Sequence, residues 1–122
     1  MQTLKIDDSK QLKDIKNAFN DHFPHLKLEF FSEEHHQGEG TERKAMYDDT
    51  LLLKDIRKNH TAGELSIDGH QKTSTFEESF FDHFGVNVQV FRKAGRIWLQ
   101  TIMTDDWTLS AQEHKGEEFD RK

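Results

Sequence analysis

The sequence predicts an α+β domain in which two tandem β-α-β units form a ferredoxin-like two-layer sandwich. Two observations lead to this fold: the chain repeats itself at about half its length, and each copy places a helical segment between short alternating apolar runs. Two such units in tandem join readily into one sheet covered by two helices. With 122 residues the chain is expected to form a single domain, made of copies spanning about residues 1–61 and 62–122.

The two copies align with an offset of 61 residues. Both contain the motif Phe-x-Asp-His-Phe, at Phe19–Phe23 and at Phe80–Phe84. After this motif the offset becomes 60, and a later match of Asp49–Leu51 with Trp107–Leu109 has an offset of 58. The remaining identical pairs are Leu4 with Leu65, Ile6 with Ile67 and Asp7 with Asp68. A motif that recurs in both copies indicates duplicated architecture, because a catalytic pair is needed once.

Each copy begins with a half-buried strand, TLKID from Thr3 and ELSID from Glu64. A helix follows, because apolar residues then recur at spacings of three and four positions. These residues are Leu12, Ile15, Phe19 and Phe23 in the first copy and Phe76, Phe80 and Phe84 in the second.

The sequence also predicts where both helices begin and end. Asp8 and Ser9 are expected to cap the first helix, and Ser74–Glu77 reads as a capping box for the second. Pro24 is expected to end the first helix. Gly85 is expected to end the second, because glycine suits the left-handed turn at a helix C-terminus.

A second strand follows each helix, at 25–31 and at 86–92. In the second copy a hairpin with Ala94 and Gly95 near its tip leads into an extra strand over 97–102. The first copy has instead a polar stretch, Ser32–Thr50, which is expected to form a loop pinned by a short strand around Ala45–Tyr47.

A helical turn is expected to close each copy, over 49–60 and over 107–116, with Gly116 ending the second. The six residues after Gly116 are expected to fray. The segment TLLLKDI from Thr50 resembles an element of ubiquitin-like folds, so a β-grasp variant is the alternative architecture.

Composition narrows the function classes. The net charge of −6 disfavours nucleic acid and anionic membranes as binding partners. The lack of cysteine excludes disulfides, thiolate nucleophiles and zinc sites with cysteine ligands. No stretch is long and apolar enough to span a membrane and no signal peptide is recognised, so a cytoplasmic location is expected. Phosphate loops, nucleotide-binding glycine patterns and metalloprotease motifs are missing, so we predict no cofactor.

Alternation along the strands places Phe31 and Phe91 on the open face of the sheet, away from the helices. In the last strand either Ile97 and Leu99 or Trp98 and Gln100 face this way, and pairing with the polar face favours Trp98. Exposed aromatic clusters often mark interfaces. Three explanations are open: the polar loop or the C-terminal segment covers this face, a partner protein or second copy binds it, or single-stranded RNA stacks on it. RNA is disfavoured because the basic and aromatic signature of RNA recognition motifs is missing.

Asp21, His22, Asp82 and His83 fall in the last turns of the two helices, where a histidine interacts favourably with the helix dipole. The alternative is a ligand or metal site formed by the two Asp-His pairs. The stretch Glu33–Gly40 adds histidines and carboxylates, but adjacent histidines in a loop lack a fixed geometry, so we predict no metal. Asp105 and Asp106 are either a general acid/base pair or helix-start residues, and the second role is favoured.

These observations predict a non-enzymatic module for protein–protein interaction or self-association, acting through the open sheet face or an edge strand. The predicted interface residues are Phe31, Phe91 and Trp98, and the partner is another protein or a second copy of the chain. The alternative is a small ligand- or metal-binding protein or enzyme with its site at Asp21, His22, Asp82 and His83.

Overall fold

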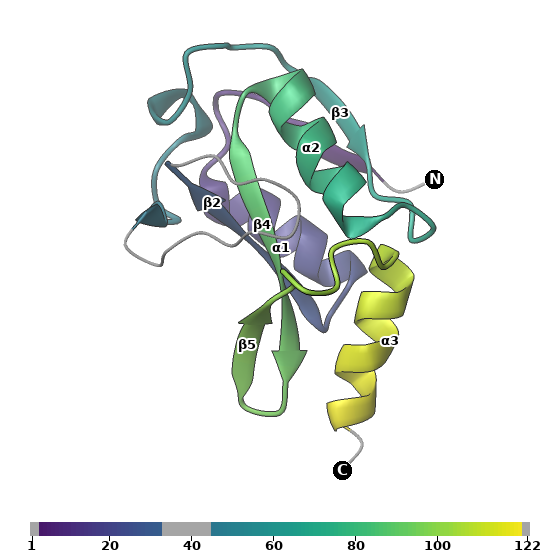
Figure 1. Cartoon of the computed structure of the whole chain (residues 1–122). Helices are drawn as coiled ribbons and strands as arrows, with labels where there is room; N and C mark the ends of the chain where they lie inside the picture. Colours follow the sequence, from purple (N-terminus) through teal and green to yellow (C-terminus); the bar gives the residue numbers. More distant parts are fainter. Residues whose placement is uncertain (1–2, 33–44, 121–122) are drawn as a thin grey trace.

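The computed structural model describes residues 3–32 and 45–120 and has an α+β architecture of three α-helices and five strands (Figure 1). The first half contains β1 (Thr3–Ile6), α1 (Leu12–His22), β2 (Leu26–Phe31) and a short 3-10 helix, η2 (Leu53–Asp55). The second half contains β3 (Gly63–Ser66), α2 (Thr73–Phe84), β4 (Asn87–Ala94), β5 (Ile97–Gln100) and α3 (Leu109–Asp120). The predicted class and the order strand, helix, strand in both halves are confirmed.

The strands form two antiparallel sheets rather than one. β1 pairs with β3, and a second sheet has the order β2-β4-β5. The predicted ferredoxin-like topology, which requires the strands of both units in a single sheet, is not shown. Each strand of the first half lies instead beside its counterpart in the second half: Leu4 is opposite Leu65, and Glu29 is opposite Gln89. The alternating pattern identified the strands but carries no information about their partners.

The phenylalanines of the repeated motif lie in the core, as predicted. Phe19 and Phe80 are fully buried, and Phe23 and Phe84 are nearly so. Phe76 joins the two helices, since its ring centroid lies 5.3 Å from that of Phe19 and 5.9 Å from that of Phe80. Burying each such ring contributes about 1.5–3 kcal/mol, so an apolar content of 33% still supports a core.

Both helices end where the sequence predicts. α2 ends at Gly85, which adopts a left-handed conformation with φ of +72° and donates its N–H to the Phe81 carbonyl at 2.8 Å. α1 ends at His22, and Pro24 follows one residue after the C-cap residue Phe23.

The predicted helix starts are wrong. α1 is capped by Gln11 and Asp14, and Asp14 accepts the backbone N–H of Gln11 at 3.0 Å. Asp8 instead accepts hydrogen bonds from Arg57 and His60, and Ser9 bonds to Asp7.

In α2 the capping box over Ser74–Glu77 is not formed. The backbone N–H of Ser74 donates to the Asp105 carbonyl at 2.7 Å. Glu77 is buried and accepts the backbone N–H of Val90 at 2.8 Å. Propensity alone cannot foresee this, because a long-range backbone contact replaces the local cap.

The starts of the two helices are held by the same kind of long-range backbone bond. In the first half the N–H of Leu12 donates to the Leu51 carbonyl, and in the second half the N–H of Thr73 donates to the Trp107 carbonyl. These bonds relate Leu51 to Trp107, an offset of 56 residues, so the predicted offset of 58 for this segment is two residues out.

The hairpin forms as predicted, whereas the C-terminal helix is longer than expected. β4 and β5 are joined by Gly95 and Arg96, with a φ of +65° at Gly95. α3 runs through Gly116 to Asp120. Gly116 lies against His25 and Lys93, and a Cβ at this position would approach the Cβ of His25 to 2.7 Å. The glycine is needed there for close packing and does not end the helix.

Candidate functional site

The predicted aromatic face is covered rather than open. Phe31 and Phe91 are 2% and 7% exposed and stack with a centroid distance of 6.4 Å. They form a cluster with Ala45, Met46 and the half-buried Trp98. Ala45 and Met46 belong to the polar stretch Ser32–Thr50, so covering by this stretch, one of the three open explanations, applies to Phe31 and Phe91. Met46 forms an antiparallel bridge with Phe31. In this arrangement Phe31 and Phe91 are not accessible to a partner.

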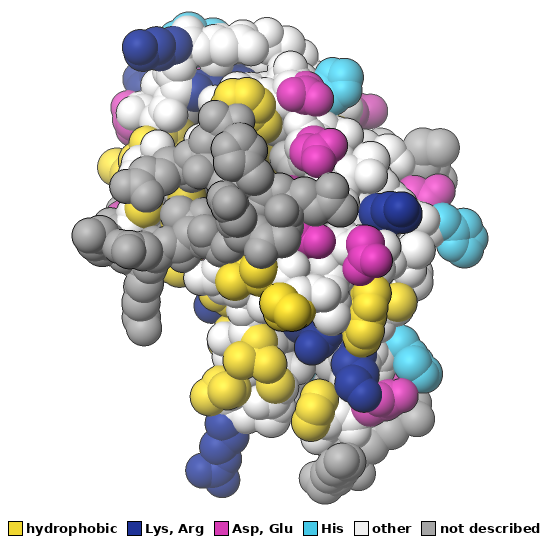
Figure 2. Space-filling view, viewed as in Figure 1, with side chains coloured by type: hydrophobic (Ala, Val, Ile, Leu, Met, Phe, Trp, Pro, Cys, Tyr) yellow, Lys and Arg dark blue, Asp and Glu magenta, His cyan; other side chains and the backbone are white. Residues whose placement is uncertain are grey.

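Apolar side chains are exposed instead on β5, the terminal strand of its sheet in the described part of the chain. Ile97 is 59% exposed and Leu99 is 41% exposed. They are two residues apart, so both side chains point to the same face of the strand. Figure 2 shows apolar side chains gathered over the β4–β5 hairpin at the lower end of the molecule. Further exposed apolar residues in the described chain are Phe81, Met103, Trp107 and Phe119.

The four predicted ligand residues lie on the surface. Asp21, His22, Asp82 and His83 are all exposed in the last turns of α1 and α2. Each histidine contacts the phenylalanine that follows it, with centroid distances of 4.5 and 6.2 Å. No hydrogen bond or ion pair described for these residues joins one of them to another, so the structure does not bring them into one site.

The other candidates from the sequence do not form a site either. The segment Glu33–Gly40 lies outside the described residues. Within residues 3–32 and 45–120 no group of three or more metal-binding side chains is present. Asp105 is buried and its carbonyl holds the start of α2, whereas Asp106 is exposed. Thr108, rather than Asp106, accepts the backbone N–H of Ala111 at the start of α3.

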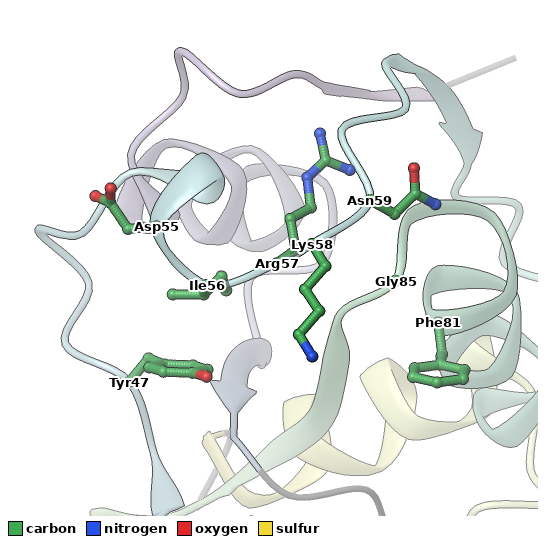
Figure 3. Close-up of a pocket in the computed structure, with 8 residues that line it drawn as sticks. All are labelled: Tyr47, Asp55, Ile56, Arg57, Lys58, Asn59, Phe81 and Gly85. Carbon is green, nitrogen blue, oxygen red and sulfur yellow. The ribbon is translucent and has the colours of Figure 1, made fainter.

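A pocket of about 520 Å³, open to solvent, lies between the segment after η2 and the C-terminal end of α2 (Figure 3). The first half contributes Tyr47 and the segment Asp55–Asn59, and the second half contributes Phe81 and Gly85. Lys58 extends into the space between the rings of Tyr47 and Phe81, and Arg57 points the opposite way.

Arg57 fixes one wall of this pocket. Its side chain is fully buried and donates to Asp8 Oδ1 from Nε at 3.1 Å and from Nη2 at 2.8 Å. Its Nη1 donates to the Phe84 carbonyl at 3.1 Å. Asp8 also accepts from His60 Nδ1 at 2.7 Å. The hydrogen bonds from Arg57, assisted by His60, lower the pKa of Asp8. The charge of Arg57 is therefore neutralised within the protein. Its neighbour Lys58 forms no hydrogen bond or ion pair with another residue of the described chain.

A second polar contact joins the other helix face to the sheet. Lys16 on α1 pairs with Glu29 on β2 at 2.6 Å. Glu77 occupies the matching position on α2. It accepts a longer hydrogen bond, of 3.4 Å, from Gln89 Nε2. Burial raises the pKa of Glu77 from 4.5 to about 8, although the hydrogen bond from Val90 opposes the shift. This carboxyl is therefore protonated at neutral pH.

The residues of the open pocket were not singled out from the sequence. One signal was available: Phe81 falls outside the helical spacing that links Phe76, Phe80 and Phe84, and it remains 40% exposed. The position of Tyr47, Lys58 and Phe81 around one pocket depends on how the two halves pack, which local patterns do not encode.

Comparisons of the chain with family models, with curated proteins and with solved structures found no match. None of the described helices is long and apolar enough to cross a membrane.

Proposed function

We propose that the chain is a non-enzymatic interaction module that self-associates through the edge strand β5. The observation that carries this proposal is the exposure of Ile97 and Leu99 on a strand whose outer edge pairs with no described strand. Apolar side chains on an unprotected edge favour pairing with another strand.

The geometry of the hairpin indicates which backbone groups are available. Ala94 and Ile97 close a two-residue turn, so they form a hydrogen-bonded pair, and the next such pair is Arg92 with Leu99. The N–H and C=O of Trp98 therefore point away from β4. An antiparallel pairing of Trp98 with Trp98 of a second copy places Ile97 beside Leu99 across the new interface and extends the sheet β2-β4-β5 into its twofold-related copy.

β5 lacks the features that commonly prevent edge pairing. Its four residues include no charged residue and no proline. Natural edge strands usually carry such residues, or a bulge, to block association. The uncharged strand supports pairing with a copy of itself.

The test is the molar mass in solution, measured by size-exclusion chromatography with light scattering over a range of concentrations. Ile97→Lys and Leu99→Lys should keep the chain at its monomer mass of 14.4 kDa, while the unmodified chain reaches twice this value. Met103→Lys is the matched control, since Met103 is 90% exposed and lies outside β5. A chain that remains monomeric up to millimolar concentration would exclude self-association.

A second readout identifies the surface. The amide proton of Trp98 should exchange slowly with solvent in the associated state and quickly in the Leu99→Lys monomer. Association without protection of this amide would assign the contact to another surface, and the proposal for β5 would fail.

The duplicated origin of the two halves is also a proposal. It is supported by the pairing of Leu4 with Leu65 and of Glu29 with Gln89, since a local twofold axis through both pairs would relate the halves. A cytoplasmic location remains a prediction. A ligand, metal or catalytic site at Asp21, His22, Asp82 and His83 is not proposed, because no described contact joins these side chains.

A further inference from the structure

We infer that the pocket beside the C-terminal end of α2 binds a small organic carboxylate that carries a flat ring. This site is distinct from β5 and does not depend on self-association. Its volume of about 520 Å³ falls within the range of about 300–1,000 Å³ that is usual for small-molecule sites.

The pocket has an aromatic or apolar side chain on each of two sides, and charged and polar residues line the rest. Tyr47 and Phe81 lie on opposite sides, and Ile56 lies near Tyr47 (Figure 3). Phe81 is 40% exposed, whereas Phe76, Phe80 and Phe84 of the same helix are buried. Covering the exposed part of this ring with a ligand is favourable, because it removes apolar surface from water. A flat ring packed against Phe81 would remove this surface from water.

Lys58 supplies the charge that selects an anion. Its side chain lies between the two rings in Figure 3, and no hydrogen bond or ion pair with a described residue is present. Arg57 also borders the pocket, but its guanidinium is neutralised by Asp8 and satisfied by the Phe84 carbonyl. Among the described lining residues, Lys58 therefore offers the one positive charge available to a ligand.

The other charges favour a monoanion over a phosphate. Asp55 borders the same pocket, and its Oδ2 accepts the backbone N–H of Leu52 at 3.1 Å. This carboxylate repels a second negative charge. Among the described residues that line the pocket, Arg57 is the single arginine, whereas phosphate sites commonly use several. Lys58 supplies one positive charge and Asp55 opposes additional negative charge, so a singly charged carboxylate is favoured over a phosphate.

The backbone around the pocket is held in place before a ligand arrives. Arg57 ties its own segment to the turn after β1 and to the end of α2 through Asp8 and Phe84. Gly85 borders the pocket just after α2, and a Cβ added there would lie 3.4 Å from the Asn59 Cβ. Such preorganisation reduces the entropy cost of binding. The open shape still predicts a weak complex, with a dissociation constant on the order of 1 mM.

Titration of the ¹⁵N-labelled chain with phenylacetate, followed by NMR, tests the inference. Saturable shifts are expected at the amides of Lys58, Asn59 and Gly85. Acetate, which lacks the ring, and phenylacetamide, which lacks the charge, should each bind at least about tenfold more weakly. Equal binding of phenylacetamide, or shifts scattered over the surface without saturation, would overturn the inference.

Two variants locate the contacts. Lys58→Gln should weaken phenylacetate binding about tenfold, and Phe81→Ser should weaken it by a similar factor. Lys54→Gln is the matched control, because Lys54 is an exposed lysine on η2 that does not border the pocket. Both lysines are exposed, so neither substitution should disturb folding. Unchanged affinity in Lys58→Gln, with a well-dispersed spectrum, would contradict the assigned role of this lysine.

Discussion

The carboxyl group of Glu77 accepts a hydrogen bond from the backbone N–H of Val90 at 2.8 Å. The pairing of β4 with β5 covers Phe91–Ala94, so Val90 lies one residue outside this ladder. The side chain of Glu77 therefore accepts the backbone N–H of Val90, which a neighbouring strand would otherwise accept. No described cation contacts Glu77, which is why burial dominates its ionisation.

The buried carboxyl predicts a loss of stability at alkaline pH. The folded-state pKa of about 8 lies above the ordinary value of 4.5, so the folded chain binds more protons between these values. The contribution of Glu77 to the free energy of unfolding is fully present below pH 4.5 and is lost as the pH rises to about 8. The slope is at most about 1.4 kcal/mol per pH unit.

Urea denaturation at several pH values between 5 and 9 measures this slope. Glu77→Gln should flatten it, because glutamine can still accept the Val90 N–H and does not ionise. The pKa values of Asp7, Asp8 and Asp48 are lowered. Their effects on the free energy of unfolding therefore appear at acid pH and do not overlap with that of Glu77. Equal slopes for both chains would show that Glu77 is not protonated in the folded state.

Gly116→Ala should destabilise the chain although alanine favours helices. The added Cβ would meet the His25 Cβ at 2.7 Å and the carbonyl oxygens of His25 and Lys93 at 3.2 and 3.4 Å. Such overpacking typically costs about 1–3 kcal/mol, which exceeds the gain of up to about 1 kcal/mol from helix propensity. Thermal unfolding measures the difference. Glu118→Ala, at an exposed position of the same helix, should change stability little, and a stabilised Gly116→Ala would show that α3 does not pack closely there.

Arg57→Met should loosen the junction between the two halves. The substitution keeps much of the buried volume, but it leaves the Phe84 carbonyl without its donor, which costs about 1–3 kcal/mol. Urea denaturation should show this loss of stability. NMR shifts should be largest at the turn around Asp8 and at Gly85, because Arg57 links these segments. Shifts confined to the neighbours of Arg57 in the sequence would argue against this role.

Salt should strengthen self-association. Each copy carries a net charge of −6, so two copies repel each other at low ionic strength. Raising the salt concentration screens this repulsion, and association of the unmodified chain should tighten roughly threefold or more between about 50 mM and 500 mM. Sedimentation equilibrium measures the constant, with Ile97→Lys as the monomeric control. Weaker association at high salt would indicate an interface formed mainly by opposite charges, and would contradict pairing of the uncharged strand β5.

Local features of the fold were predictable because neighbouring residues determine them. The spacing of Phe19 and Phe23 identified a buried helix face, and Gly85 marked the end of α2 with its left-handed conformation. Gly95 marked the β4–β5 turn in the same way. These outcomes follow from periodicity and from the steric freedom of glycine, which act over a few residues.

The candidate sites could be predicted only in part. Alternation placed Phe31 and Phe91 on one face, but their burial under Ala45 and Met46 was one of several open possibilities. The exposed edge strand was foreseen, whereas the pocket between Tyr47 and Phe81 was not. Side-chain direction follows from the strand pattern, but what lies above a side chain depends on residues distant in the sequence.

The amino-acid sequence by itself determined the helices, the strands and the side chains that face the core, since each depends on contacts within a few residues. Tertiary structure alone decided that β1 lies beside β3, that Glu77 bonds to a strand rather than caps a helix, and that Lys58 lines one pocket with Tyr47 and Phe81. The physical reason is that these contacts join segments far apart in the chain, and their free energy depends on the packing of the whole core.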